Sequence, residues 1–389
     1  MRLLLRKLAG VGSAFPILLI LLALCTLGYL AITSATFLNE RLQDAPVTQL
    51  KYAIAGFMVF LAVALTPYRL LVRISPFLYF VGVVLLVAVF LAHASHGAQS
   101  WIRVAGFSFE PAEFAKVAFI LALAWFLRLR EKHMHRFLTV LLAWLITAVP
   151  FLLILKQPAL GTASVFFPIC FAMLFVAGAR LHHLLIPIAL VASVMVFAYY
   201  WFHVWDKPGH VTVFNHEVRF LKDFQVYRIK VFFDPELDPQ GAGWQIDQAM
   251  LALGSGGWEG KGWRQGTETV LGYLPRNTSY NDLIFPVIGE NFGFPGAAGL
   301  IICEGLVLIW CVTVAARSRD KTGALIAVGV MAMLFTHIFV NIGMTMEVVP
   351  ITGIPLPFVS YGGTFLIVCL AAMGLVQSVW VHHKNLERL

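Results

Sequence analysis

Charged residues are scarce in this sequence: Asp, Glu, Lys and Arg make up 12% of the 389 residues, whereas 60% are hydrophobic and 13% aromatic. The mean hydropathy of +0.83 lies far outside the range of soluble globular domains. Soluble classes of protein are therefore excluded. Because only helices and closed barrels satisfy their backbone inside a bilayer, long apolar runs predict an all-α polytopic membrane protein.

Cysteine and metal-ligand patterns are equally sparse. The five cysteines lie within apolar runs, so we predict buried thiols and no structural disulfide. The histidines lack the spacing of metal ligands, and no metal site is predicted. Lys261 follows several glycines but is not followed by Ser or Thr, which disfavours a phosphate-binding loop and ATP.

About ten apolar runs can be placed as transmembrane helices across a hydrocarbon core of about 30 Å. They lie near 14–33, 52–66, 75–94, 112–128, 137–155, 163–178, 184–203, 283–315, 324–346 and 360–381. The first run has no small-residue cleavage site, so it is expected to be a helix and not a removed signal peptide. A long extracytoplasmic loop, 204–282, is expected between the seventh and eighth helices.

The distribution of Lys and Arg predicts the orientation, because cytoplasmic loops near helix ends retain these residues. With both termini in the cytoplasm, most of the basic residues fall on the cytoplasmic side, and the basic loop 204–282 is long enough to escape the rule. The net charge of +8 then reflects topology and contact with anionic membrane lipids. Nucleic acid is not a predicted partner.

The loop 204–282 has internal order that a simple linker would not need. Apolar residues recur at helical spacing over 218–233, which predicts a helix that lies in the membrane interface or packs on the bundle. The following stretch contains eight glycines between 241 and 266, which permit tight turns and close backbone approach to a ligand. The loop ends in YNDLIFP, where Asp282 is a candidate base or, alternatively, the N-cap of the next helix.

Polar residues inside or beside the spans are expected to be paired or functional. Glu113 and Lys116 stand at i, i+3 and can form an ion pair on one helix face. Glu304 and His337 are expected to be satisfied interior groups. The run NIGMTMEVVPITGIPLPFVSYGGT predicts a broken helix that lines a cavity.

The motifs GAQSWIRVAGFSFEPAEFAK, KQPALGT, DPELDPQGAGWQIDQAMLALGSGGWEGKGW, NDLIF, NIGM and PLPFVSYGG occur in order along nearly the whole chain. In this respect the sequence resembles the SEDS family of polytopic peptidoglycan glycosyltransferases, and its elongation branch, RodA, more than its division branch, FtsW. The resemblance implies a single ten-helix domain over residues 1–389 in the bacterial inner membrane. It also implies lipid II, the undecaprenyl-linked disaccharide-pentapeptide, as substrate, a class B penicillin-binding protein transpeptidase as partner, and work with the elongation machinery.

The same resemblance implies roles for particular residues. The essential acid of the family falls on Asp282, and its ion pair falls on Glu113 and Lys116. Further cavity positions of the family are matched by Gln248, Glu290, Ser360 and Tyr361.

Joining two sugars by displacement of an anomeric diphosphate needs a base, cations near the diphosphate and an apolar route for the lipid tails. Asp282 is predicted to take the proton of the acceptor hydroxyl, with inversion at the anomeric carbon. The candidate diphosphate clamps are Arg103, Lys116, Arg228, Lys261 and Arg276. No firmly bound cofactor is predicted; a divalent cation, Mg²⁺ or Mn²⁺, held loosely with the diphosphate is the one candidate.

Two other classes of function stay open at the level of sequence. A flippase for a polyprenyl-linked precursor would also use intramembrane charges and broken helices, although no internal repeat is evident. A membrane scaffold without activity is the third class, but it leaves Asp282 and the glycine-rich stretch unexplained.

Overall fold

The computed structural model describes residues 15–91, 102–104, 107–157, 159–186, 189, 193, 210–213, 216–219, 231–232, 241–275 and 278–382. Within these residues, eight helices are long and apolar enough to cross a membrane. A further helix of 19 residues, α5, carries Glu113, Lys116 and Arg128. The predicted all-α polytopic fold is confirmed. The predicted span at 184–203 lies mostly outside the described residues.

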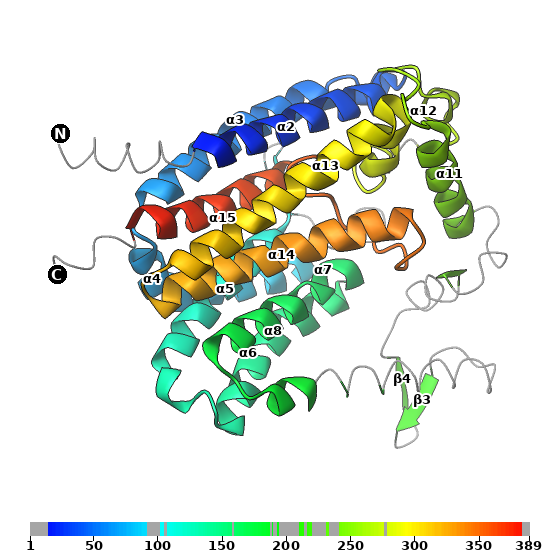
Figure 1. Ribbon diagram of the computed structural model, residues 1–389. Helices are drawn as coiled ribbons and strands as arrows, with labels where there is room; N and C mark the ends of the chain where they lie inside the picture. Colours follow the sequence, from blue (N-terminus) through cyan, green and yellow to red (C-terminus); the bar gives the residue numbers. More distant parts are fainter. Residues whose placement is uncertain are drawn as a thin grey trace.

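The helices lie side by side in a bundle, with the short helices α11 and α12 at its right-hand end in Figure 1. The long helices are α2 (Phe15–Thr36), α3 (Ala45–Leu65), α4 (Tyr68–Ala88), α5 (Pro111–Leu129), α6 (Phe137–Lys156), α8 (Phe166–Ala177), α13 (Ile284–Arg317), α14 (Lys321–Thr345) and α15 (Gly363–His382). The shorter helices are α7 (Leu160–Ser164), α11 (Ala242–Ser255) and α12 (Thr267–Leu271), with 3-10 turns η1 (Glu40–Leu42), η2 (Val89–Leu91) and η3 (Glu131–His133). Two antiparallel hairpins pair β1 (Ile102–Val104) with β2 (Phe107–Phe109) and β3 (His210–Val213) with β4 (His216–Arg219).

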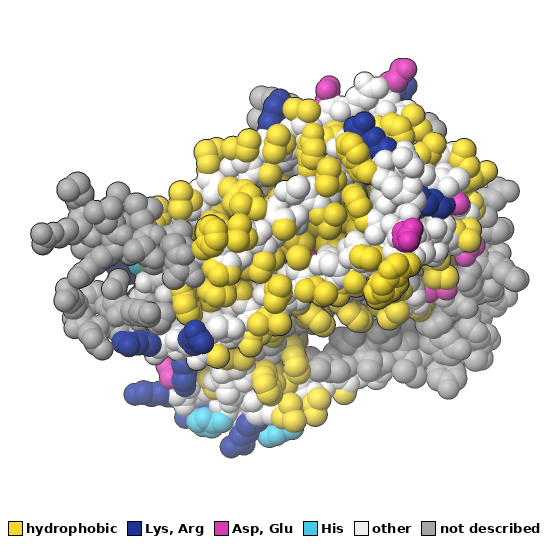
Figure 2. Space-filling view, turned by 45° about the horizontal axis from the view of Figure 1, so that its top comes forward, with side chains coloured by type: hydrophobic (Ala, Val, Ile, Leu, Met, Phe, Trp, Pro, Cys, Tyr) yellow, Lys and Arg dark blue, Asp and Glu magenta, His cyan; other side chains and the backbone are white. Residues whose placement is uncertain are grey.

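α14 and α15 form the centre of the bundle. In the most apolar 18-residue segment of each helix, 67% of the residues of α14 and 78% of those of α15 are buried, against 22–44% for the other spans. α15 packs on α3, α5, α13 and α14, and α14 also packs on α8. Hydrophobic side chains cover the middle of the molecule, and most charged side chains lie toward its two ends (Figure 2). The five cysteines are free; Cys170, Cys311 and Cys369 are buried as predicted, whereas Cys25 and Cys303 are only half-buried.

One end of the bundle, here named the basic end, is held together by Asp320. This residue caps α14 by accepting a hydrogen bond from the backbone N–H of Gly323 at 3.2 Å. It also accepts a hydrogen bond from the Tyr68 hydroxyl at 2.7 Å and lies 3.8 Å from Nε of Arg69. One short carboxylate therefore joins the start of α4 to the start of α14.

The opposite end, here named the loop end, carries α11, α12 and, between them, the part of the glycine-rich stretch at 256–266. α13 is interrupted at Gly293, whose φ of 63° and ψ of −160° suit glycine alone. The stretch fits into this interruption: Phe294 donates its N–H to the carbonyl of Gly257 at 2.9 Å, and Lys261 donates to that of Glu290 at 2.9 Å. A side chain on Gly260 would meet the backbone of α13. The sequence pattern predicted a close approach of these glycines to a ligand; for Gly256 and Gly260 the observed close approach is to α13.

Two predicted helix starts are wrong. α3 begins at Ala45 and α4 at Tyr68, each seven residues earlier than predicted. Hydropathy misses their first turns because these contain Lys51, Arg69 and Arg73, whose long side chains can reach the interface while the backbone stays helical. The predicted interfacial helix 218–233 lies mostly outside the described residues, and its first two residues belong to β4.

Candidate active site

The buried ion pair of α5 is formed as the sequence predicts. Lys116 Nζ lies 2.8 Å from Glu113 Oε1, and both residues are buried at 0% and 2% exposure. Nζ also lies 2.7 Å from Nε2 of His337 on α14. Since Nδ1 of His337 lies 3.2 Å from the carbonyl of Pro355, we assign the proton to Nδ1, which leaves Nε2 as an acceptor for the ammonium.

His337 and Glu304 were both expected to be satisfied. For His337 this is confirmed by its two contacts. For Glu304 it is wrong: the side chain is fully buried on α13, and neither carboxylate oxygen has a hydrogen-bond partner among the described residues. Leu300 and Val307, about one turn away on either side, belong to the hydrophobic core, so the surroundings of Glu304 are apolar.

Asp282 lies in the turn that leads into α13 at the loop end. The N-cap position of α13 is Leu283 and no side chain caps it, so the N-cap alternative for Asp282 is not what the structure has. The carbonyl of Asp282 accepts a hydrogen bond from Nδ2 of Asn341 at 2.9 Å. Its Oδ2 faces Gly353, where a Cβ would lie 3.2 Å away and where φ is 72°. The half-buried carboxylate of Asp282 therefore lies against the backbone of Gly353.

The proline loop, residues 346–362, holds the turn of Asp282 from the other side. Asn341 also donates to the carbonyl of Ile354 at 2.7 Å. Ser360 is 1% exposed; its hydroxyl donates to the carbonyl of Asn281 at 2.6 Å and accepts from the N–H of Leu356 at 2.8 Å. Ser360 thus holds the backbone of Asn281, the residue next to the catalytic candidate Asp282.

Tyr361 continues this contact. Its N–H donates to the carbonyl of Tyr280 at 3.0 Å, and the two rings meet edge-on with centroids 5.4 Å apart. Burial, and then the charge of Asp282, raise the pKa of Tyr280. Gln49 of α3 also holds the proline loop, by donating a hydrogen bond to the carbonyl of Ser360 at 3.0 Å.

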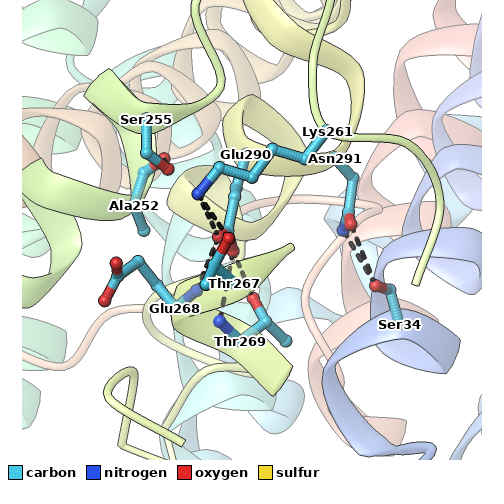
Figure 3. A network of polar contacts seen from close by, with 9 residues as sticks. All are labelled: Ser34, Ala252, Ser255, Lys261, Thr267, Glu268, Thr269, Glu290 and Asn291. Carbon is cyan, nitrogen blue, oxygen red and sulfur yellow. Dashed lines mark hydrogen bonds and ion pairs between the residues drawn. The ribbon is translucent and has the colours of Figure 1, made fainter. Parts of the chain in front are cut away.

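Glu290 and Lys261 form a separate cluster, drawn in Figure 3. The fully buried carboxylate of Glu290 accepts hydrogen bonds from the N–H of Glu268 at 2.7 Å and from the N–H and hydroxyl of Thr269 at 3.2 and 2.7 Å. Lys261 Nζ lies 3.4 Å from the same carboxylate and donates to the Thr267 hydroxyl at 2.8 Å. An anionic side chain at the start of α12 accepts hydrogen bonds from backbone N–H groups that have no partner within the helix.

The remaining predicted residues are only partly described. Gln248 lies half-buried on α11. Arg103 pairs with Ser108 across the β1–β2 hairpin, and its side chain lies outside the description. Arg228 and Arg276 also fall outside the described residues.

One acidic residue of this end was not singled out by the sequence. Glu110, half-buried, lies between β2 and α5. Burial, followed by the charge of Glu113, raises the pKa of Glu110 to about 8; this value includes a lowering effect of Lys116 and a smaller raising effect of Asp282. Its position directly before Pro111, three residues from Glu113, was the available signal. Asn341, within NIGM, was missed as well.

An apolar cavity adjoins the proline loop. It has a volume of about 310 Å³ and opens between α2 and α3. Its lining is mostly apolar, with Phe358 of the proline loop, Gln49 and Tyr29 among the contributing residues.

Fold and site together define a polytopic α-helical membrane protein with a polar candidate active site at one end of its bundle. The model of the cell cycle protein family, that of FtsW, RodA and SpoVE, matches residues 15–385, and the chain belongs to this family. The family resemblance predicted from the sequence motifs is confirmed.

Relatives and solved structures cover nearly the whole chain. The peptidoglycan glycosyltransferase MrdB of Escherichia coli K12 is 35% identical over 95% of this chain and 94% of its own. The peptidoglycan glycosyltransferase RodA of Treponema pallidum is 33% identical over 94% and 96%. A chain from a peptidoglycan synthase complex, described for its coordination of polymerization and crosslinking, has a TM-score of 0.77 with 26% identity over 95% and 98%. RodA of Thermus thermophilus, with a TM-score of 0.64 and 23% identity over 95% and 97%, shares the fold.

Proposed function

We propose that this protein is a peptidoglycan glycosyltransferase that polymerises lipid II into β-1,4 glycan strands during cell-wall elongation. The observation that carries the proposal is the setting of Asp282. Its backbone is held by Asn341, its neighbour Asn281 by Ser360, and its carboxylate faces a bare glycine. A base must be held rigidly, and these contacts support that role for Asp282.

In the proposed reaction, the Asp282 carboxylate takes the proton of the acceptor's 4-hydroxyl. The hydroxyl oxygen attacks the anomeric carbon of the donor from the face opposite the diphosphate, which departs with the bonding electrons. The configuration inverts and a β-1,4 link results. Asn341 and Ser360 keep the base in place during this step.

The diphosphate needs cations. The described contacts separate the candidate basic residues into those that already have protein partners and those left as direct clamps. Lys261 is held by Glu290 and Thr267, which supports a role for Lys261 and Glu290 in fastening the loop. Lys116 is shared by Glu113 and His337, which supports a role in organising the site. Arg103, Arg228 and Arg276 therefore remain the proposed direct clamps, with Gln248 as a proposed contact to the sugar.

A divalent cation would fit the same step. Diphosphate oxygens are ligands that Mg²⁺ prefers, so we propose that Mg²⁺ or Mn²⁺ enters with the diphosphate. The lipid tails are proposed to use the apolar cavity between α2 and α3, which adjoins the proline loop.

The proposed topology puts the loop end outside the cytoplasm and both termini inside it, in the bacterial inner membrane. A class B transpeptidase is the proposed partner, since the related complex couples polymerization to crosslinking. A flippase is less well supported, because the interruption of α13 at Gly293 is filled by the glycine-rich stretch.

Polymerisation of purified lipid II by the detergent-solubilised protein, with and without its transpeptidase, tests the function. Substrate in detergent needs no flipping, so a polymerase yields glycan strands there and a flippase or scaffold yields none. Repeating the assay with EDTA tests the divalent cation.

A further inference from the structure

A second apolar groove lies between α2 and α13, which run side by side in the bundle (Figure 1). It has a volume of about 280 Å³, and Leu27 of α2 and Phe292, Gly299 and Cys303 of α13 contribute to its walls. A Cβ at Gly299 would meet nothing within 4 Å, so the groove is open at that point. It shares no lining residue with the cavity between α2 and α3. An open apolar groove on a membrane-spanning bundle is suited to an acyl chain.

The glycine-rich stretch lies at the loop end of both walls of this groove. Trp263 donates its indole N–H to the carbonyl of Leu30 at 3.0 Å, about one turn beyond the part of α2 that lines the groove. Gly262 donates its backbone N–H to the carbonyl of Asn291 at 3.0 Å, directly before the part of α13 that lines it. The side chain of Trp263 is therefore fixed where the groove ends.

Arg264 adds a positive charge at this end of the groove. Its guanidinium carbon lies 4.4 Å from the ring centroid of Trp263 and 5.6 Å from that of Phe37, just after α2, within the range of cation–π contacts. Arg264 is exposed, and its φ of 63° is uncommon for a residue other than glycine, so the surrounding structure holds it in place. Among the described residues it has no carboxylate partner. The N–H groups of the guanidinium can therefore bind an anion.

We propose that Arg264 and the groove between α2 and α13 form a binding site for a phospholipid whose head group carries a net negative charge. Its phosphate would lie at Arg264 and one acyl chain in the groove. The planar guanidinium matches the oxygens of a phosphate, and tryptophan is enriched at the depth of the membrane where head groups lie. A single cation without a carboxylate partner favours an anionic head group over a zwitterionic one. Such a lipid would link α2, α13 and the glycine-rich stretch.

The test uses the full-length protein in nanodiscs of phosphatidylcholine. A small amount of phosphatidylglycerol or of phosphatidylcholine with a photoreactive acyl chain is included, and crosslinked peptides are identified by mass spectrometry. Crosslinks to the α2 and α13 walls should be about fivefold more frequent from phosphatidylglycerol, as expected for one arginine near an anionic head group. Arg264→Gln should remove this preference. Arg317→Gln, which removes an exposed arginine over the ring of Trp380 at the basic end, is the matched control and should keep it.

Gly299→Leu tests the groove itself. Because the new side chain would occupy the open space at Gly299, crosslinks from both lipids to the walls of the groove should fall. Gly305→Leu is the control, since Gly305 lies in the same helix, has nothing within 4 Å of its Cβ position and is not part of the lining. It should leave the crosslinks unchanged.

Equal crosslinking by the two lipids in the wild type, or a preference that survives Arg264→Gln, would overturn the inference. Addition of undecaprenyl diphosphate in an amount equal to the phosphatidylglycerol probe, or of the class B transpeptidase, should leave the crosslinks in place. If either abolished them, the groove would belong to that polyprenyl chain or to that protein, and the phospholipid site would be wrong. These measurements need no turnover, so their failure can be told apart from failure of the proposed function.

Discussion

At the scale of single residues, Lys116 is a charged side chain buried inside the bundle. It is fully buried, and its ammonium is balanced by one carboxylate and one neutral imidazole. A buried pair adds little net stability while it is intact, but removal of one partner leaves an uncompensated charge. The second acceptor, His337, came from α14 and could not be paired with Lys116 from sequence spacing alone.

We expect Glu113→Ala and Lys116→Ala each to lower the free energy of unfolding by about 3–5 kcal/mol, measured by thermal unfolding in detergent. Lys321→Ala is the control. Lys321 and Glu131 are 2.7 Å apart but 64% and 47% exposed, and an exposed pair is worth about 0–1 kcal/mol. Equal losses for the buried and exposed lysines would contradict the account.

The charge swap Glu113→Lys with Lys116→Glu should recover only part of the loss. It restores a pair, but it turns a carboxylate toward the Nε2 lone pair of His337, whose Nδ1 proton is held by Pro355. Full recovery of stability would show that His337 is not a required partner.

At the scale of elements, the interruption of α13 organises the loop end. The glycine-rich stretch packs where α13 leaves helical geometry, and Glu290, one turn earlier, holds α12. This arrangement explains why glycines gather in the sequence around 254–266 and why a buried carboxylate precedes Gly293.

Gly293→Ala should destabilise the protein by about 1–3 kcal/mol, because its backbone conformation is open almost only to glycine and a Cβ there would meet the backbone of Trp258 and Gly260. Limited proteolysis should show faster cleavage in the glycine-rich stretch. Gly305→Ala, in the same helix with nothing within 4 Å of its Cβ position, should be neutral or slightly stabilising. If the two variants behaved alike, the interruption would have no structural role.

At the scale of the whole molecule, the sequence predicted the spans and the Glu113–Lys116 pair because these depend on local runs and on i, i+3 spacing. It did not predict which groups meet at Asp282. Asn341 and Ser360 lie 59 and 79 residues from the carbonyls they bind at Asp282 and Asn281, and only packing of α14 and the proline loop brings them there. The hydrogen-bond donors of Glu290 on the folded-back α12 were not predicted for the same reason.

The predicted orientation also belongs to this scale. In a background without the native cysteines, Gly254→Cys, at the exposed end of α11, should react with a membrane-impermeant thiol reagent in intact spheroplasts. Arg319→Cys, in the exposed turn between α13 and α14, should react only after the membrane is opened. The reverse pattern would put the proposed site on the wrong side of the membrane.

The central claim is that Asp282 is the base of a lipid II polymerase, and glycan polymerisation by Asp282→Asn tests it most directly. Asn keeps the size of the side chain, and the backbone contact to Asn341 is untouched, so the variant should fold and still bind lipid II. Its polymerisation rate should fall about 10²-fold or more, as expected for loss of a positioned base. Asp44→Asn, an exposed acid before α3 that caps nothing, should keep the wild-type rate. Near-normal polymer from a folded Asp282→Asn protein would contradict the account.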